Sequence, residues 1–484
     1  MEKKQQGYIT LYLTLTLGIM ITLVFLLLEA VRNETMRVET EGVMDLSLYS
    51  VFGEYHRQLL EQYDLFFLDT SYGQGRPDVK RSEERLQYYM NENFRKEEKN
   101  WYEVLDFTNL VCDNVTFECY QYAGDDKGQV LKDQIIDYMK DKTGIDKAEE
   151  FLSEFGILQK DGYLSKDFSK EWDMADGNLR RLIEQKKDEM IKEGAEEVPI
   201  GLDNPADYVK EVKAQGILGL VVPPKTEVSA MTIHPEYYFS HREISRGVGI
   251  LREKETAINK ILENYLLWEY FMEKCGFYSS EKEPSVLKYQ IEYLLFGNAC
   301  DLDNLEAAVN KILHIREVVN FVYLMSDSGK MAEAESLALV VSLLLFSPEI
   351  KDAVKSTILF AWSFAESVKD VKILMDGNKL PLVKTKESWN TPLVNLPMFT
   401  AFLNQYEISN EGIDYEDYLR FFMSLKEEKE LLYGFMDLCE MDIRITEGNE
   451  YFQMDGCISA VKAKVNVSSG YGKGYEITRT YQYE

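Results

Sequence analysis

Two histidines and a glutamate near the middle of the chain could do metal chemistry. His234, Glu236 and His241 carry imidazole nitrogens and a carboxylate, which are donors that zinc takes in proteins. The two histidines are seven residues apart across a loop that contains a proline, and this is not a recognised ligand spacing. We therefore interpret them as surface or packing residues, and we predict no metal site.

An acidic segment and a glycine-rich segment are the other candidates. Asp301, Asp303 and Glu306 are similar to the start of a calcium loop, but the glycine and the distal glutamate of such a loop are not in register. Asp303 is better placed to cap a helix. The alternate glycines at 470–474 lie between two predicted strands and precede no helix, which excludes a phosphate-binding loop and leaves a flexible hairpin. We predict no cofactor.

The usual catalytic signatures are absent from the sequence. It contains no HExxH, no GxSxG, no phosphate-binding P-loop and no C-x-x-C pair. We expect no enzymatic activity. The six cysteines are scattered, so buried thiols are the default interpretation. If most of the chain lies outside the membrane, the simplest disulfides would join Cys112 to Cys119 or Cys439 to Cys457.

The charge balance excludes one class of partner. The chain has 484 residues with 54 Lys and Arg against 83 Asp and Glu, a net charge of −29. Such a chain repels phosphate backbones and anionic head groups, so nucleic acid is not expected as a partner. A hydrophobic content of 45% is enough for a packed core, and about two to four domains are expected at this length.

The first thirty residues predict a membrane anchor. From Tyr8 to Leu28 there is no charged residue, His, Asn, Gln or Pro, and at about 1.5 Å per residue this run covers a hydrocarbon core of roughly 30 Å. We predict a single transmembrane helix over 8–31. A cleaved secretory signal is the alternative, although Leu28-Glu29-Ala30 is a poor cleavage site.

One side of this predicted helix carries small or hydroxyl-bearing residues. Thr10, Thr14, Gly18 and Thr22 recur every four residues and would form a ridge that lets another membrane helix approach closely. The alternative is equally consistent with the sequence. In it, each threonine hydroxyl bonds the carbonyl one turn back and faces lipid without a partner.

The helix is predicted to continue past the membrane as an amphipathic stalk over 32–70. No proline interrupts this range, and its apolar residues recur at spacings of three and four, which is typical of one face of a helix. That stripe should pack on the body of the protein. Its members are Met44, Leu48, Val51, Tyr55, Leu59, Tyr63 and Phe66.

The rest of the chain begins with strands, passes through helices and returns to strands. The predicted strands are Val104–Cys112, Val115–Ala123 (joined to the first by an Asp113-Asn114 turn), Thr226–Ile233, Met441–Thr446, Cys457–Val467 and Tyr475–Tyr483. The predicted helices of the middle region are Leu251–Lys274, Ser285–Phe296, Asp303–Leu324, Ala332–Phe346 and Pro348–Leu374. Ala332–Phe346 is apolar nearly all round and is expected to be a central buried helix.

These patterns predict a helix-rich α+β fold. A long N-terminal transmembrane and stalk helix leads into a small antiparallel sheet domain with a large all-helical insertion, because strands far apart in sequence can complete one sheet. The predicted division is a leader-like peptide at 1–7, the membrane helix at 8–31, the stalk at 32–70, an α/β region at 71–246, a helical insertion at 247–375, and a helix with C-terminal strands at 376–484.

The N-terminus resembles a pilin-type leader. A short basic peptide ends in Gly7 and is followed by Tyr8 and the long apolar helix, as in leaders that a prepilin peptidase cuts on the cytoplasmic side after the glycine. The other segments with family resemblance are Glu34–Arg37, Ser50–Tyr55, Tyr63–Asp69, Glu292–Gly297, Ile315–Glu317 and Ala361–Ser367. They resemble a Gram-positive family of uncharacterised membrane-anchored proteins associated with tight-adherence (Tad/Flp-type) pilus loci, with a TadE/TadG-like, pseudopilin-like N-terminus.

The resemblance implies a non-enzymatic, minor pseudopilin-like component of a Tad/Flp-type pilus or secretion apparatus, acting in assembly or anchoring. Its partners would be the membrane and other pilus or secretion-platform membrane proteins. The N-terminus would be cytoplasmic and the bulk of the chain extracytoplasmic. Type IV pilins carry Glu at the fifth position after the cut, where this chain has Tyr12. That departure favours a membrane-resident assembly subunit over a filament subunit.

The alternative is a signal-anchored extracytoplasmic enzyme or ligand-sensing protein of the cell envelope. A pocket with convergent carboxylates or histidines and shifted pKa values would favour this alternative. A body without such a pocket, with exposed apolar surface on the stalk, would favour the assembly role. Glu366, on an apolar-rich predicted helix, is the carboxylate to examine first, and if it is buried and paired its role is structural.

Overall fold

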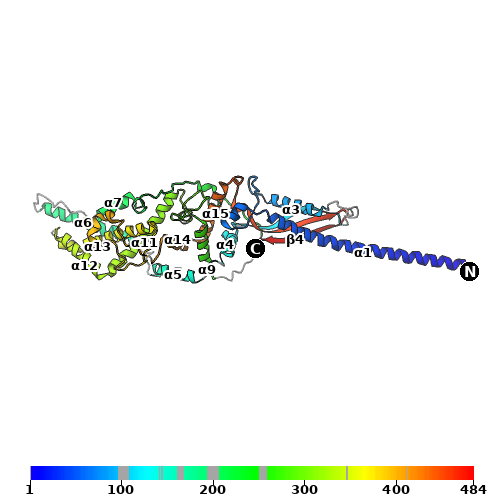
Figure 1. Cartoon of the computed structure of the whole chain (residues 1–484), viewed down its shortest axis with the longest axis horizontal. Coiled ribbons are helices and arrows are strands. Elements are labelled where there is room, and N and C mark those ends of the chain that lie inside the picture. The colour runs from blue at the N-terminus through cyan, green and yellow to red at the C-terminus, as the bar shows by residue number, and fades with distance from the viewer. Residues whose placement is uncertain are drawn as a thin grey trace. The chain divides into compact units, whose positions relative to one another are not determined.

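The computed structural model describes residues 2–95, 108–140, 142, 145–160, 168–192, 206–249, 259–344, 347–409 and 411–483. The chain forms two compact units. The sheet unit comprises 1–138, 236–257 and 435–484, and the helical unit comprises 139–235 and 258–434. The chain is helix-rich α+β, with a long apolar N-terminal helix and one small antiparallel sheet, as the sequence predicts (Figure 1).

The sheet unit holds the N-terminal helix and the described strands. Its helices are α1 (Glu2–Phe52), α2 (Arg57–Tyr63), α3 (Val79–Phe94), α4 (Asp125–Met139), the short turns η1 (Pro235–Tyr237), η2 (Phe239–His241) and η5 (Met454–Gly456), and the second half of α15 (Glu428–Arg444). Its strands are β1 (Leu68–Asp69), β2 (Leu110–Tyr122), β3 (Cys457–Ser469) and β4 (Gly474–Gln482).

Strand β3 is the centre of the sheet. It pairs antiparallel with β2 on one side, and with β4 and the short β1 on the other. Val461, Ala463, Val465 and Val467 alternate toward the core, which is the period-two pattern that predicted this strand. β2 and β3 are separated by more than 300 residues, so the helical unit is inserted between paired neighbours of one sheet.

Four predicted strands differ from the structure. Asp113-Asn114 is not a turn, because it lies inside the single strand β2, where the register shifts at a bulge between Cys112 and Asn114. Residues 104–107 of the first predicted strand lie outside the described residues. Met441–Thr446 is mostly the end of α15. Thr226–Ile233 is not a strand and makes only an isolated bridge, from Thr232 to Cys300.

The second half of α1 packs beside α3 on one face of the sheet. Met44, Leu48 and Val51 of the predicted stripe are buried there, together with Leu86 and Met90 of α3. Each fully buried side chain of this size stabilises the unit by about 1.5–3 kcal/mol relative to exposure. The layer between α1, α3 and the sheet is therefore the main apolar core of this unit.

The stalk helix is shorter than predicted, because α1 ends at Phe52 instead of running to residue 70. The chain then turns, and His56 caps α2 by accepting a hydrogen bond at Nδ1 from the Leu59 amide at 3.2 Å. The His56 amide donates to the Phe67 carbonyl at 2.9 Å, so the chain folds back and reaches the sheet as β1. Leu59 and Tyr63 are still buried, now from the separate helix α2.

The helical unit contains no named strand among its described residues. Its elements are α5 (Ile145–Lys160), α6 (Phe168–Lys192), α7 (Ala206–Gln215), α8 (Leu218–Val221), α9 (Lys260–Lys274), α10 (Gln290–Phe296), α11 (Asp301–Ser326), α12 (Ser328–Leu344), η3 (Pro348–Ile350), α13 (Lys351–Met375), η4 (Leu393–Phe402), α14 (Tyr415–Ser424) and the first half of α15. The unit begins earlier and ends later than the predicted insertion at 247–375, because α6, α7 and α8 before this range and η4 after it also pack on α13.

The central helix of this unit is α13, and the prediction that Ala332–Phe346 would be central and buried is wrong. In α13, every residue from Thr357 to Met375 is buried. In α12, only Ala334, Ala338 and Ser342 are buried, because this narrow row of small residues is the face that packs inward. Larger apolar residues of α12 are exposed, including Leu343 and Leu344.

Candidate functional site

The apolar half of α1 is the strongest functional feature in the described residues. It is the one helix there with the length and composition of a membrane span, and its apolar window is not covered by the rest of the chain. Leu11, Leu17 and Phe25 are each more than half exposed. The first half of α1 therefore has the character of a membrane anchor or signal anchor, on the same helix whose second half belongs to the sheet core (Figure 1).

The predicted leader and ridge residues all lie on α1. Gly7 and Tyr8 are inside the helix, which begins at Glu2. The Thr14 hydroxyl donates to the Leu11 carbonyl at 2.9 Å, and the Thr22 hydroxyl donates to the Gly18 carbonyl at 2.7 Å. Thr10 lies on the same exposed side. A side chain at position 18 would meet open space. The ridge is thus exposed and low in profile, with these two hydroxyls bonded inside their own helix.

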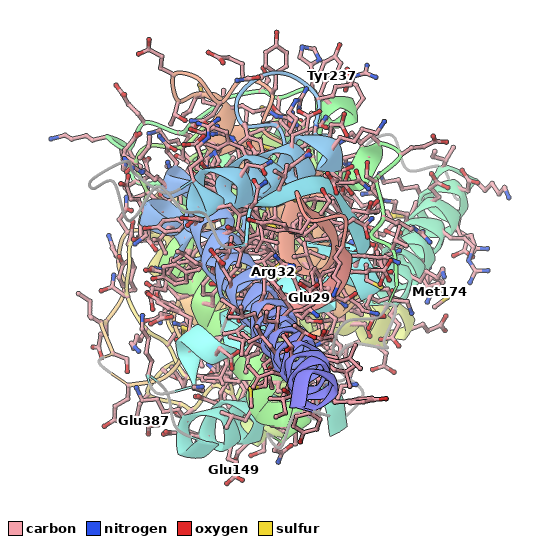
Figure 2. The ribbon with its side chains drawn as sticks, turned by 90° about the vertical axis from the view of Figure 1, so that its right-hand side faces the viewer. Glu29, Arg32, Glu149, Met174, Tyr237 and Glu387 are labelled. Carbon is pink, nitrogen blue, oxygen red and sulfur yellow. The ribbon has the colours of Figure 1, made fainter. Side chains whose placement is uncertain are left out.

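A polar cluster begins directly after the apolar half. We call it the α1–hairpin cluster: Glu29, Arg32 and Asn33 on α1, and Tyr471 and Lys473 in the β3–β4 hairpin. The Lys473 Nζ lies 2.9 Å from Glu29 Oε1 and donates to Asn33 Oδ1 at 2.8 Å. The Arg32 guanidinium lies 4.1 Å from the Tyr471 ring centroid and also pairs with Glu29. Figure 2 looks along α1 and shows Glu29 and Arg32 beside the sheet.

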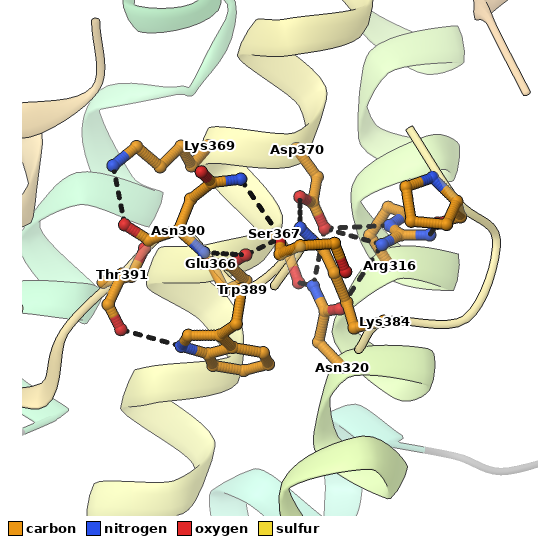
Figure 3. Close-up of polar contacts among 12 residues, drawn as sticks. Arg316, Asn320, Glu366, Ser367, Lys369, Asp370, Lys384, Trp389, Asn390 and Thr391 are labelled. Carbon is orange, nitrogen blue, oxygen red and sulfur yellow. Dashed lines mark hydrogen bonds and ion pairs between the residues drawn. The ribbon is translucent and has the colours of Figure 1, made fainter. Parts of the chain in front are cut away.

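The helical unit contains a second cluster of charges around α13, and this cluster is buried. This buried ionic cluster consists of Arg316 and Asn320 on α11, Glu366 and Asp370 on α13, and Lys384 (Figure 3). Arg316 Nη2 lies 2.8 Å from Asp370 Oδ2, and Lys384 Nζ lies 2.7 Å from Glu366 Oε1 and 2.6 Å from Asp370 Oδ1. Asn320 donates to Asp370 Oδ2 at 2.8 Å.

The ionic cluster has the features of a structural site. Its two carboxylates and two cations balance, which is the condition for burying charges in a core. Burial raises the pKa of Asp370, but Arg316 and Lys384 outweigh this effect and hold that pKa below its usual value. Glu366 is fully buried and paired, so the carboxylate that the sequence singled out acts in packing the unit. The sequence offered no signal for its partner Lys384, which follows in a loop.

A different carboxylate in the helical unit is buried, and no described cation forms an ion pair with it. Glu292 on α10 is fully buried, and its Oε1 accepts hydrogen bonds from the Tyr415 hydroxyl at 2.7 Å and the Tyr278 amide at 3.0 Å. Burial raises the pKa of Glu292 to about 7, against the lowering effect of these hydrogen bonds. The Tyr415 side chain that donates one of these hydrogen bonds is itself buried.

A sizeable cavity in the helical unit is lined by described residues. Its volume is about 950 Å³, and it lies between α7, α12, α13 and η4. Of the described residues that line it, none is a histidine, and apolar side chains such as Leu337, Ile358 and Leu396 predominate. Two lining charges are engaged in ion pairs, Asp207 with Arg180 and Lys210 with Asp176. The cavity therefore suits an apolar or amphipathic occupant better than it suits acid–base catalysis.

The described residues contain no group of three or more His, Cys, Asp or Glu that could hold a metal ion. His234, Glu236 and His241 are consequently not brought together as ligands. All six cysteines are free thiols, including the pairs Cys112 with Cys119 and Cys439 with Cys457.

Comparison with known proteins identifies a family whose function is unknown. No curated protein and no solved structure matches the chain. One family model matches residues 195–469, which is more than half of the 484 residues and includes the ionic cluster and β3 but not α1 or β2. The chain belongs to this family, which is described as a family of unknown function (DUF5702).

Proposed function

We propose that the protein is a non-enzymatic, single-pass membrane-anchored component of a Tad/Flp-type pilus or secretion apparatus, acting in assembly or anchoring. The observation that carries the proposal is the division of α1. Its first half is apolar and exposed, and its second half is built into the core of the sheet unit. An anchor of this kind transmits the position of the membrane helix directly to a folded head.

The two halves of α1 are stabilised by different interactions. At the centre of a bilayer each Leu, Ile, Phe or Val favours insertion by about 0.3–0.6 kcal/mol, and the span from Tyr8 to Leu28 carries no charge to oppose it. From Met36 onward the helix is stabilised by packing on the sheet instead. Because one uninterrupted helix joins the two regions, the head is held by α1 itself and not by a flexible linker.

The proposal also includes a topology in the membrane and a class of partner. A leader cut on the cytoplasmic side would leave the N-terminus in the cytoplasm and the acidic body outside the membrane. With Tyr12 in place of the pilin glutamate, the chain lacks the carboxylate that pairs with a neighbouring subunit's terminal amine. We therefore propose a subunit that stays in the membrane and binds other pilus or secretion-platform proteins through α1, with the Thr10–Thr22 ridge as the contact face.

Mass spectrometry of the N-terminus of membrane-extracted protein tests the leader. We expect a mature chain that begins at Tyr8. The Gly7→Val variant, which removes the small residue at the cut, should retain the intact N-terminus. An intact Met1 in the wild type, or a cut near Ala30, would contradict the proposed processing.

The contact face has its own test. Gly18→Ile places a bulky side chain on the ridge, and we expect it to reduce the recovery of proteins that co-purify with the wild-type chain in mild detergent. Leu23→Ile is the matched control, because Leu23 lies five residues after Gly18 and is exposed on the side of the helix away from the ridge. Equal recovery with both variants would rule out the ridge as a helix contact.

Ligand sensing in the envelope is the second candidate function, and the cavity of about 950 Å³ favours it. Its apolar lining and its size fall within the range of small-molecule sites. Native mass spectrometry of the purified full chain should then detect a bound amphipathic molecule. Replacing Leu337 with Trp, which narrows the cavity, should release it. A chain recovered without any bound molecule counts against this candidate.

A further inference from the structure

The β3–β4 hairpin lies against α1 at the point where its apolar run ends. Lys473 reaches Glu29 and Asn33, and Tyr471 stacks under Arg32. The last residue of the uncharged run is Leu28. The hairpin tip, residues 468–474, is therefore fixed at the level of the first turn of α1 beyond the span.

The length of the span places this level relative to a bilayer. Tyr8 to Leu28 is 21 residues, which at about 1.5 Å per residue is about 31 Å, the thickness of one hydrocarbon core. If this run fills the core, residues 29–33 lie in the adjoining headgroup layer. The hairpin tip contacts these same residues, so it lies in that layer too.

The composition of the tip suits this position. Tyrosine and lysine are residue types of the membrane interface, where an apolar body and a polar end are both accommodated. Tyr471 remains 49% exposed although one ring face is near Arg32. Residues 468–474 contain no Asp or Glu, in a chain of net charge −29. The tip is thus a part of the acidic head that anionic or zwitterionic headgroups do not repel.

The backbone allows the tip to be narrow. Gly472 has φ +81°, in the left-handed region that glycine favours, and Gly470 packs so closely on the Asn109 side chain that a Cβ would clash with it. The Gly470 amide also donates to the Asn109 carbonyl at 2.9 Å. The loop is therefore held to the end of the sheet, and Tyr471 projects between two glycines.

We propose that the β3–β4 hairpin tip is a second membrane contact, in which Tyr471 and Lys473 lie among phospholipid headgroups beside α1. Two contact points, the helix and the tip, fix both the height of the sheet unit above the bilayer and its rotation about the α1 axis. This inference rests on the proposed role of α1 as a membrane anchor.

Photo-crosslinking in bilayers tests the tip and the anchor separately. The full chain is reconstituted into nanodiscs of phosphatidylcholine and phosphatidylglycerol with p-benzoylphenylalanine in place of one residue. Tyr471 is the test position. Tyr451 is the matched control, since it is also an exposed tyrosine (58%) but precedes the opposite end of β3, and 13 strand residues separate the ends by about 40 Å. Phe25, inside the span, is the positive control.

Mass spectrometry of the irradiated protein distinguishes the outcomes. We expect lipid adducts at positions 25 and 471, with position 471 several-fold above position 451. Adducts at 25 with 471 no higher than 451 would overturn the tip contact and leave the anchor standing. An absence of adducts at 25 would overturn the anchor itself. Crosslinking of position 471 to protein in place of lipid, in membranes from cells, would also overturn the tip contact.

Discussion

Under α1 in the sheet unit the buried layer is apolar, whereas the centre of the helical unit carries charged groups on α13. Leu48 and Val51 represent the first kind of core, packed against the sheet. Asp370 and Glu366 represent the second, each paired with a buried cation. The two cores should therefore fail differently. An apolar layer loses stability in proportion to the cavity made, while an ionic core loses it by leaving a charge without its partner.

The difference also bears on function. The family match covers the ionic cluster but not α1, so the apolar helix is not what places this chain in its family. The apolar layer ties the sheet unit to α1 and hence to the proposed anchor. The helical unit, with its ionic core and its cavity, is a separate compact unit. Predictions that separate the two units therefore test the anchor-bearing unit apart from the helical unit.

The largest expected effect is in the ionic core. Asp370→Ala leaves Arg316 and Lys384 buried with one anionic partner fewer, which should cost about 3–5 kcal/mol of unfolding free energy in the helical unit. Hydrogen exchange of peptides from α11 and α13 measures this loss, and peptides of β3 should change less. Asp352→Ala, at an exposed position of α13, is the control and should cost less than about 1 kcal/mol. Equal effects of the two variants would contradict a structural role for the cluster.

The next effect belongs to the apolar layer. Leu48→Ala removes a side chain that is 1% exposed, and we expect a loss of about 3 kcal/mol in the sheet unit. Leu46→Ala, two residues away on the same helix and 53% exposed, should change little. Hydrogen exchange of α1 and β3 peptides is the measurement. If both variants weaken exchange protection equally, the half of α1 beyond residue 36 is not mounted on the sheet as described.

Sequence patterns predicted the elements in which buried and exposed residues alternate with a regular period. β3 and β4 alternate with period two, and the α1 stripe follows a helical period, so their faces could be read directly. The pattern failed at Met441–Thr446, where Asp442 is buried on α15 and bonded by the Tyr63 hydroxyl at 2.8 Å. The sequence of this segment alternates between apolar and polar residues, but the burial does not, because Asp442 is buried together with its neighbours Met441 and Ile443.

The candidate sites were harder to predict for the same reason. Glu29 and Lys473 are more than 400 residues apart, and no local pattern links them. Glu366 was singled out by its apolar surroundings, but those surroundings do not identify Lys384 as its partner. The exposure of α12 was missed because its composition is apolar all round, and only packing shows that the small residues face inward.

The smallest effect sharpens the contrast between paired and unpaired buried carboxylates, and it depends on pH. The folded-state pKa of Glu292 is about 7, raised by burial from 4.5, so the folded helical unit binds this proton more tightly than the unfolded chain does. The contribution of Glu292 to the free energy of unfolding is fully present below the pKa of the unfolded state, and it is lost as the pH rises through about 7. Glu292→Gln stays neutral and should not show that loss. The pKa difference between the folded and unfolded states corresponds to roughly 3 kcal/mol of stability that the wild type loses at high pH. The Gln amide leaves some hydrogen bonds unmade, which offsets part of this gain. By about pH 8 the variant should therefore be more stable than the wild type by about 2 kcal/mol.

Hydrogen exchange of α10 and α14 peptides, followed from about pH 5 to about pH 8 and corrected for intrinsic exchange, measures this crossover. Glu227→Gln, at an exposed position of the same unit, is the control and should track the wild type at every pH. Because Asp370 is held ionised by two cations and Glu292 faces two tyrosines, only the second should show a stability gain on neutralisation. A Glu292→Gln variant whose advantage is the same at both ends of the range would show that burial of this carboxylate, and not its charge, sets the energetics of the site.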